Sequence, residues 1–470
     1  MFFIIKFYEE NPAGRTYKSE SKKNREAVSM SLFQITNKTN TMKKLSHQIL
    51  QIHVFFFLVI FQLPSYSQNI NPIYGLGFSP YKDGQSPNIG SRISESQIDS
   101  LLKIIKPYTN WIRTYSCAHG IEKTGKIAHK LGLKIAAGAY LGPDMKANQD
   151  EINNLISAGK NDEIDIAVVG NEVFRSGLNV QQLMDYISQV KTALPNIKVT
   201  TGEIYSDYLK YPKLIKAVDF LLVHIYPFWE NENIDCAIYF LNSTYEKVKT
   251  NAEGKEICIG EAGWASCGYK QGRAEPGPEN ASAHFLNFIS WAKEKQVNYF
   301  YFEAFDESWK TKDEGTGMQG GCWGIWDKDG KMKPGMNRVF EGKVNKDNWM
   351  VKVPPFPSDN SSIEFTHVPG KTSNDWLEGV VKGVLPQDYK VAIYIKINGS
   401  CWTKPTFAEP LTEIDCDGTF RCNIFTGGAN DKKASEVCAY LLPSGKKPGL
   451  MKGNCNIAID PNKIFSATIK

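Results

Sequence analysis

The sequence predicts an α/β fold, a (β/α)8 TIM barrel, followed by a small all-β sandwich domain. The chain has 470 residues, which exceeds one ordinary domain and leaves room for a barrel of about 250 residues and a smaller partner. Between residues 73 and 344, strand-like apolar runs alternate with helix-like stretches, as in parallel α/β folds. Beyond residue 351 short strand-like runs dominate, which favours an all-β domain.

Eight strand-like runs are expected to form the barrel in chain order. An open doubly wound sheet usually binds a nucleotide through a GxGxxG turn, and none follows the first strand, so the pattern favours a closed barrel. The helix after the first strand is expected to begin at Ser94, with Gln97 in a capping-box position, and to stop at Pro107. The predicted strands are Ile73–Phe78, Trp111–Cys117, Lys134–Tyr140, Ile166–Val173, Lys198–Ile204, Phe220–Tyr226, Ile257–Gly263 and Tyr299–Phe305.

The N-terminal residues read as a targeting segment that precedes the barrel. Met42-Lys43-Lys44 supplies a positive n-region, Ile49 to Leu63 an apolar run, and Ser65-Tyr66-Ser67 a small-x-small cleavage pattern. We therefore expect 42–67 to be a signal peptide, with cleavage near Ser67/Gln68 and a secreted product, extracellular, periplasmic or at the cell surface. A retained membrane anchor is the alternative. Residues 1–41 are interpreted as a non-native extension that arises from an upstream start site.

The charge balance of the expected mature chain points to a neutral partner. Residues 1–67 hold nine Lys/Arg and four Asp/Glu, so 46 basic and 46 acidic residues remain after them. This balance argues against nucleic-acid or anionic-membrane binding and suits a polysaccharide. No CxxC or HExxH pattern occurs and the seven histidines are scattered, so we expect no metal and no cofactor. No protein partner is implied, and a monomer is expected.

The domain limits follow from composition. The barrel is expected over 68–350, a proline-rich linker over 351–362, and the β-sandwich over 363–470. Five cysteines fall in the barrel segment and five in the C-terminal segment. Two odd counts require either a disulfide between the segments or at least two free thiols, and spacing alone does not give the pairing.

Carboxylates stand where a barrel places its reactive side chains, at the C-terminal ends of the strands. Glu172 follows the fourth strand in Gly170-Asn171-Glu172, and Glu261 ends the seventh in Ile259-Gly260-Glu261. Retaining glycosidases need two carboxyl groups about 5–5.5 Å apart, one as acid and one as nucleophile. A solvated or ion-paired loop role is the alternative for each glutamate alone, and the pairing at two strand ends favours catalysis.

Other strand-end residues are expected to support this pair. Asn171 suits a hydrogen bond to a sugar 2-hydroxyl, with a turn or cap role as the alternative. Arg113 suits a charge that keeps the nucleophile ionised, with a plain salt bridge equally expected. Aromatic side chains offer stacking surfaces for sugar rings, although core packing is an equal alternative for each. The remaining candidate substrate-binding residues are Tyr115, Tyr226, Trp229, Trp264, Glu303, Glu307 and Lys310.

Seven short motifs in order resemble those of family 17 of the glycoside hydrolases, the β-1,3-glucanase family of a large retaining TIM-barrel clan. The resemblance covers roughly residues 73–340 and is nearest to the family's bacterial branch. The motifs are Gly75-Leu76-Gly77-Phe78-Ser79-Pro80-Tyr81, Ile112-Arg113-Thr114-Tyr115-Ser116, Val168-Val169-Gly170-Asn171-Glu172-Val173, His224-Ile225-Tyr226-Pro227-Phe228-Trp229, Ile259-Gly260-Glu261-Ala262-Gly263-Trp264, Phe302-Glu303-Ala304-Phe305-Asp306-Glu307-Ser308-Trp309-Lys310 and Trp323-Gly324-Ile325-Trp326.

The resemblance implies roles for matched positions. Glu172 matches the family's acid/base, Glu261 its nucleophile, and Glu303, Glu307 and Lys310 an auxiliary polar cluster. Ala265 and Ser308 replace prolines of the family pattern, and neither change removes a functional group. The expected function is a secreted retaining glycosidase, of the glucan β-1,3-glucosidase type, which cleaves β-1,3-glucan polysaccharide or oligosaccharide. A β-1,3-glucan transglycosylase is the alternative, and a non-catalytic glycan-binding protein is less favoured.

Overall fold

A computed structural model describes residues 70–313, 316–345, 361–373, 375–455 and 465–469. The expected extension over 1–41, the expected signal peptide over 42–67 and most of the expected linker over 351–362 lie outside these residues. Within the described part of the chain, no helix combines the length and the apolar character needed to cross a bilayer.

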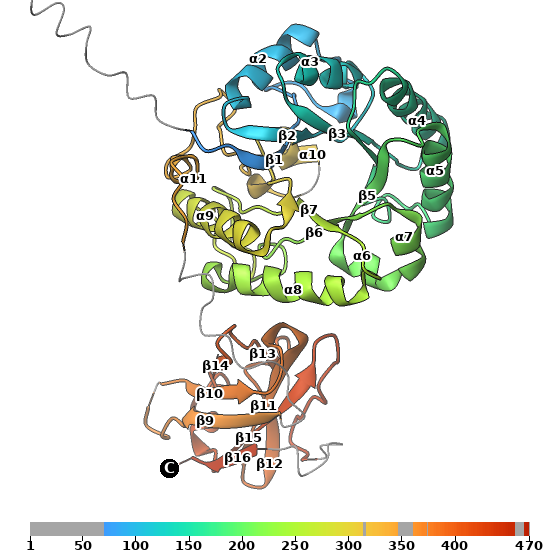
Figure 1. Cartoon of the computed structure of the whole chain (residues 1–470). Coiled ribbons are helices and arrows are strands. Elements are labelled where there is room, and N and C mark those ends of the chain that lie inside the picture. Colours follow the sequence, from blue (N-terminus) through green and yellow to red (C-terminus); the bar gives the residue numbers. More distant parts are fainter. Residues whose placement is uncertain (1–69, 314–315, 346–360, 374, 456–464, 470) are drawn as a thin grey trace, which may run out of the picture. The chain divides into compact units, whose positions relative to one another are not determined.

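Eight parallel strands form the barrel, in the order β1-β2-β3-β4-β5-β6-β7-β8 along one sheet. Apolar, largely buried strands of this kind occur where helices cover the outside of a parallel sheet. Figure 1 shows the helices as a ring outside the strands. The strands are β1 Ile73–Gly77, β2 Thr109–Arg113, β3 Lys134–Ala139, β4 Ile166–Asn171, β5 Lys198–Ile204, β6 Leu221–His224, β7 Ile257–Glu261 and β8 Asn298–Tyr299.

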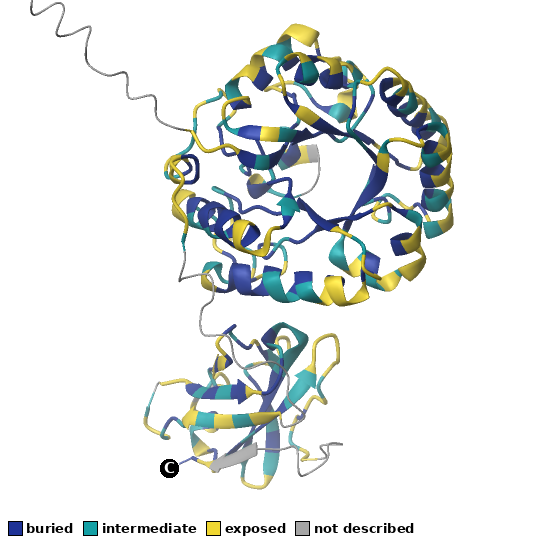
Figure 2. Ribbon diagram, in the orientation of Figure 1, coloured by how far each residue is buried: buried dark blue, intermediate teal, exposed yellow. Residues whose placement is uncertain are grey.

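The helices bury one apolar stripe and expose the other face, as the colours of Figure 2 show. In the helix expected after the first strand, the Ser94 side chain accepts a hydrogen bond from the Gln97 backbone N–H. The helices are α2 Glu95–Ile105, α3 Thr124–Lys130, α4 Met145–Lys160, α5 Val180–Ala193, α6 Tyr205–Lys210, α7 Pro212–Ala217, α8 Ala237–Asn251, α9 Pro278–Lys295, α10 Lys310–Asp313 and α11 Asn337–Phe340.

The last strand is shorter than predicted. Beyond it, the chain closes the barrel through backbone hydrogen bonds that go alternately to β1 and to the residues after β7. Tyr301 N–H donates to Gly75 O of β1, and Phe302 N–H donates to Ala262 O beyond β7. Ala304 N–H then returns to Gly77 O of β1. The predicted run Tyr299–Phe305 therefore lies between the first and seventh strands as expected, but only Asn298–Tyr299 is regular strand. The second strand is displaced from the predicted Trp111–Cys117 to Thr109–Arg113, the fifth matches its prediction, and the remaining five end one to two residues early, the sixth also starting one residue late.

A small cluster of buried apolar side chains joins neighbouring strands of the barrel. Its members are Ala136, Val168, Phe220, Leu222, Cys258 and Phe300. Side chains from alternate strands packed in layers are what fill the interior of such a barrel. Burial raises the pKa of the Cys258 thiol, which is the state of a packed residue and not of a nucleophile.

The C-terminal part is all-β and consists of two antiparallel sheets over one core, in accordance with the predicted sandwich. A three-stranded sheet has the order β14-β10-β9, and a five-stranded sheet has β12-β11-β15-β16 with β13 beside β11. Buried side chains of both sheets, among them Leu377, Phe420, Ile393 and Val437, form a single cluster. The strands are β9 Ser362–His367, β10 Leu377–Lys382, β11 Tyr389–Ile397, β12 Ser400–Lys404, β13 Leu411–Thr412, β14 Thr419–Cys422, β15 Glu436–Pro443 and β16 Phe465–Thr468.

The cysteine pairing shows why both segments hold an odd number. One disulfide, Cys236–Cys416, joins the barrel segment to the C-terminal segment across 180 residues. Cys267–Cys322 and Cys401–Cys455 each stay within one segment. Two thiols on each side stay unpaired: Cys117, Cys258, Cys422 and Cys438.

Candidate active site

The end of β4 is shaped to turn Glu172 inward. The pairing of β4 with β5 shifts register between Val168 and Asn171, and Gly170 has φ 82°. A side chain at Gly170 would also collide with Val173, since a Cβ there would lie 2.4 Å from its Cγ1. Glu172 follows with φ 47°, a left-handed conformation rare for this residue type, and its N–H donates to Gly202 O at 2.8 Å. Such irregular backbone clusters at functional sites.

Arg113, at the end of β2, is fully buried and links the other strand ends. Its Nη1 donates to Gly260 O at 2.8 Å and to Glu261 Oε1 at 3.1 Å. Its Nη2 donates to the Asn171 side-chain oxygen at 2.5 Å. Space for the guanidinium exists because residue 202 is glycine: a Cβ there would lie 2.2 Å from Nη2. A buried, charge-assisted fork of this kind fixes several side chains at once.

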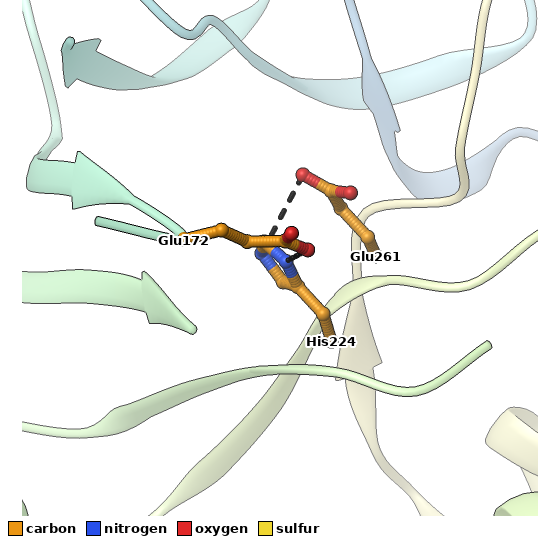
Figure 3. A group of neighbouring side chains, drawn as sticks. All are labelled: Glu172, His224 and Glu261. Atoms are coloured by element: carbon orange, nitrogen blue, oxygen red, sulfur yellow. Dashed lines mark hydrogen bonds and ion pairs between the residues drawn. The ribbon is translucent and has the colours of Figure 1, made fainter. Parts of the chain in front are cut away.

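His224, at the end of β6, stands between the two carboxyl groups (Figure 3). Its Nδ1 lies 2.9 Å from Glu172 Oε1, and its Nε2 lies 3.0 Å from Arg113 Nη1 and 3.5 Å from Glu261 Oε1. Burial lowers the pKa of His224 to about 3, so the imidazole is neutral near pH 7. Because an arginine only donates, Nε2 accepts, and the ring proton sits on Nδ1. His224 therefore donates to Oε1 of Glu172.

The two glutamates are close enough to act on one bond. One carboxylate oxygen from each, together with a ring nitrogen of His224, lie within 4.8 Å of one another. Oxygens this close are compatible with a retaining pair, whose carboxyl groups stand about 5–5.5 Å apart, and fit less well the separation of about 6.5–9.5 Å in inverting enzymes. Burial raises the pKa of Glu172, against the opposing charges of Arg175 and Arg113. Glu261 receives two donors, Arg113 on Oε1 and the Tyr226 hydroxyl on Oε2 at 2.7 Å.

The same three side chains have the composition of a metal site, but their surroundings do not fit one. Glu172, His224 and Glu261 each offer one ligand atom. The guanidinium of Arg113 already contacts both His224 Nε2 and Glu261 Oε1. A metal cation would face that fixed positive charge at short range, so we assign no metal to this group.

Glu303, Glu307 and Lys310 form a second buried cluster, as expected from the sequence. Lys310 Nζ lies 2.7 Å from Glu303 Oε2 and 2.5 Å from Glu307 Oε2, and 4.4 Å from the centroid of the Phe302 ring. Burial raises the pKa of Glu303 well above its ordinary value. Burial opposes ionisation of Glu307 as well, but the ammonium of Lys310 holds its pKa below the ordinary value. The cluster therefore holds one protonated and one ionised carboxyl group.

Tyr115 connects the two clusters. Its ring lies 5.0 Å from the guanidinium carbon of Arg113 and packs against Phe302 at 6.3 Å between centroids. Its hydroxyl is buried and has no hydrogen-bond partner among the described residues. Glu303, in contrast, shares a side-chain hydrogen bond with Glu307. Buried polar atoms usually have partners, so the Tyr115 hydroxyl is a candidate for a bond to a ligand.

The two predicted tryptophans differ in their placement. Trp229 is half-buried in the loop that follows β6, and the centroid of its ring lies 5.5 Å from that of Trp323. Trp264 is only 1% exposed, and its Nε1 donates to Glu275 O at 2.9 Å. Its ring packs on Phe228, so the expected sugar-stacking role does not fit Trp264. The structure brings the other predicted residues into the two clusters or beside them.

Two functional candidates, Arg175 and Ser79, were not singled out from the sequence. His224 is expected at the end of the sixth predicted strand with Tyr226 and Trp229, but the sequence gives it no specific role. Arg175 lies 3.1 Å from Glu172 Oε2, and Ser79 donates its hydroxyl to Glu307 Oε1. The last two contacts depend on loop conformation, which the sequence pattern does not show.

Comparison with known proteins covers the barrel. A model of the BtgE/BtgC glycoside hydrolase domain matches residues 75–324 and ends before the C-terminal sheets. A glucan 1,3-beta-glucosidase of Candida albicans is 25% identical over 296 residues, 58% of this chain and 96% of that protein. One from Arthroderma benhamiae is 28% identical over 263 residues, 52% of this chain and 83% of that protein. These relatives are fungal, which gives no support to the expected bacterial branch.

The fold has a matching solved structure. The glycoside hydrolase family 17 beta-1,3-glucanosyltransferase from Rhizomucor miehei is 28% identical, with a TM-score of 0.50, over 56% of this chain and 96% of that chain. An endo-laminarinase from Formosa, 19% identical with a TM-score of 0.50, shares the fold over 60% of this chain and 91% of that chain.

Proposed function

Because the chain belongs to the BtgE/BtgC glycoside hydrolase family, we propose that it is a retaining enzyme acting on β-1,3-linked glucan, with Glu261 as nucleophile and Glu172 as acid/base. The observation that carries the proposal is that one oxygen of each carboxyl group lies within 4.8 Å of one of the other, at strand ends whose side chains Arg113 and His224 contact. The β-1,3 linkage is proposed from the printed names of the relatives.

The first step breaks the glycosidic bond and forms an ester. The ionised Glu261 attacks the anomeric carbon, the bond from that carbon to the leaving oxygen breaks, and the proton of Glu172 passes to this oxygen. Arg113 and Tyr226 donate hydrogen bonds to Glu261 and hold its carboxylate in position. Burial raises the pKa of Glu172, which keeps it protonated to higher pH, as an acid requires.

The second step restores the enzyme. An acceptor hydroxyl attacks the anomeric carbon, its proton passes to the now ionised Glu172, and the ester bond to Glu261 breaks. Water as acceptor gives hydrolysis, and a second glucan gives transglycosylation. The printed name of the Rhizomucor miehei relative supports the transferase as the second candidate. The secretion proposed from Met42–Ser67 would bring the enzyme to a glucan outside the cell.

Product analysis tests the reaction. The full chain is incubated with a β-1,3-gluco-oligosaccharide, and products are identified by mass spectrometry. Shorter products alone identify a hydrolase, and additional longer products identify a transferase. No product, with no product from β-1,4 and β-1,6 oligosaccharides either, would contradict the proposal and favour a glycan-binding protein.

Covalent trapping tests the nucleophile. An activated 2-deoxy-2-fluoro-β-glucoside should form a stable ester on Glu261, found by peptide mass spectrometry. Glu261→Ala should not be labelled, whereas Glu294→Gln, at an exposed position on α9, should be labelled as the wild type is. Label on any other carboxylate would overturn the assignment.

A further inference from the structure

The turn after β4 brings a cation against the proposed acid/base. Nη1 of Arg175 lies 3.1 Å from Oε2 of Glu172, three residues earlier. The backbone bond from Arg175 N–H to Glu172 O, 3.1 Å long, closes this turn and keeps the two side chains on one side. Arg175 is 67% exposed, whereas the Glu172 side chain is 18% exposed. The ion pair therefore stands at the rim of the site.

The two oxygens of Glu172 are not equivalent. Oε1 accepts the Nδ1–H of His224, as the neutral imidazole requires. The proton that the acid donates is therefore carried on Oε2, which is the oxygen that Arg175 contacts. A guanidinium has five donors and no acceptor, so it favours the ionised carboxylate over the protonated one. Arg175 at this position therefore disfavours protonation of Oε2.

Charged and titratable groups from several elements face Glu172, and Arg175 differs from all of them. Of the two arginines that lower the pKa of Glu172, Arg113 is fully buried and bound to Asn171 and Glu261, whereas Arg175 is exposed. The groups that face Glu172 from other elements are Arg113, Glu203, Asp207, His224, Tyr226 and Glu261. Burial raises the pKa of Glu203 well above its ordinary value, so this neighbour is neutral.

Arg175 has other acidic neighbours within its electrostatic reach. Burial raises the pKa of Asp207 at α6 and of Glu230 beyond β6, and the charge of Arg175 opposes this rise in both. An exposed arginine side chain is long and changes rotamer readily, and single exposed ion pairs are weak. A ligand oxygen that reaches Oε2 can therefore displace Arg175 at small cost, toward either carboxylate.

We propose that Arg175 is a positioning residue that holds Glu172 ionised while the acceptor side of the site is empty, and that it leaves Oε2 when a glucan oxygen reaches that atom. The identity of the ligand as a glucan rests on the proposed function. The effect of Arg175 on Glu172 rests on the ion pair between them. The proposal assigns Arg175 to the states in which Glu172 is ionised and no glucan oxygen has reached Oε2, namely the empty enzyme and the ester before the acceptor arrives. When the substrate oxygen displaces Arg175, Oε2 takes up a proton from solvent and Glu172 enters its acid state.

The first measurement follows the ionisation of Glu172 without any substrate. The full chain is labelled with carboxyl-¹³C glutamate, and Glu172→Gln identifies the resonance by its absence. Arg175→Ala should move the titration midpoint of Glu172 to higher pH, and Arg175→Lys should move it less. Arg338→Ala, at an exposed arginine on α11, should leave it in place. An unchanged midpoint in Arg175→Ala would overturn the proposal.

The second measurement is the pH dependence of kcat/KM on a β-1,3-gluco-oligosaccharide. On the alkaline side of the optimum, Arg175→Ala should gain about two- to fivefold over the wild type, as expected for an exposed pair. It should show no gain on the acid side. A higher KM with an unmoved alkaline limb would mean that Arg175 only contacts sugar, which contradicts the proposal. If neither the wild type nor any variant turns over glucan, but the titration midpoint of the Glu172 resonance still shifts in Arg175→Ala, then the proposed function fails and the assignment of Arg175 stands.

Discussion

The hydroxyl of Tyr226 donates a 2.7 Å hydrogen bond to Oε2 of Glu261. Burial raises the pKa of Tyr226 well above its ordinary value, so the phenol stays a neutral donor through the working pH range. Tyr226→Phe should lower kcat/KM by about 10- to 100-fold, the effect of one lost hydrogen bond to a charged group. Trapping by the fluoroglucoside should become slower by a similar factor. Unchanged trapping would show that the hydroxyl does not serve the nucleophile.

Glu172→Gln should separate the two steps of the reaction. With an oligosaccharide, whose leaving oxygen needs a proton, the variant should lose about 10²- to 10⁴-fold in kcat/KM. With an aryl glucoside of acidic leaving group, the first step should survive, and azide should restore turnover as a β-glucosyl azide. The alkaline fall of activity should also vanish, because the wild type loses activity as pH rises through the pKa of Glu172. An α-azide product would contradict retention.

The same substitution at Glu303 and at Glu307 should change the stability by very different amounts. Glu303→Gln replaces a protonated carboxyl by a neutral group, so stability should change little. Glu307→Gln leaves the buried Lys310 without its ionised partner and should cost about 3–5 kcal/mol. The lowered pKa of Glu307 means that its contribution is present above its ordinary pKa and is lost as pH falls through the folded-state pKa. Thermal unfolding against pH measures both, and equal losses in the two variants would contradict the assignment.

Gly202→Ala should disrupt the site by displacing the side chain of Arg113. A Cβ at residue 202 would lie 2.2 Å from Arg113 Nη2 and 2.9 Å from His224 Nε2, so the guanidinium must move. We expect a stability loss of about 1–3 kcal/mol from overpacking and at least a ~100-fold loss of kcat/KM. Gly449→Ala, where the nearest atom would be 3.8 Å away, is the matched control. Full activity in Gly202→Ala would show that the position of Arg113 is not critical.

The bridge Cys236–Cys416 should couple the unfolding of the barrel to that of the β-sandwich. Arg273 strengthens this contact, since it pairs with Glu232 of the barrel at 3.2 Å and with Asp415 of the sandwich at 2.5 Å. Replacement of both cysteines by serine should cost about 2–4 kcal/mol and split one calorimetric transition into two. The double serine variant of Cys401 and Cys455 should lower stability without splitting. A single transition in the first variant would contradict the coupling.

The barrel strands and the two glutamates at their ends were predictable from the local pattern of apolar residues. Eight apolar runs gave the strands, and Glu172 and Glu261 could be paired because parallel strands of a barrel end at one face. The length of the eighth strand was not predictable from the sequence. The backbone N–H groups of Tyr301, Phe302 and Ala304 donate alternately to β1 and to the chain beyond β7, so a regular strand ladder does not form there.

Features set by the approach of distant segments were beyond the sequence pattern. Trp264 follows the proposed nucleophile Glu261 by three positions, which predicts an aromatic side chain in the site, yet its ring packs on Phe228 and its Nε1 donates to the carbonyl of Glu275. The contact of Arg175 with Glu172 depends on the left-handed φ of Glu172, which re-aims the turn. The pairing of Cys236 with Cys416 depends on which loops meet.

The neutrality of His224 has a consequence for the whole cycle. In the empty site, the charges of Glu172, Glu261, Arg113 and the proposed partner Arg175 cancel. With substrate bound, Arg175 has left and Glu172 is protonated, so Glu261 and Arg113 cancel. In the ester, Glu261 is uncharged, the ionised Glu172 balances Arg113, and Arg175 stands again at the exposed rim. A charged imidazole would add one buried positive charge to each of these states. The buried groups Glu172, Glu261, Arg113 and His224 thus keep a net charge of zero from the bound acid state to the ester, and only the exposed Arg175 changes place.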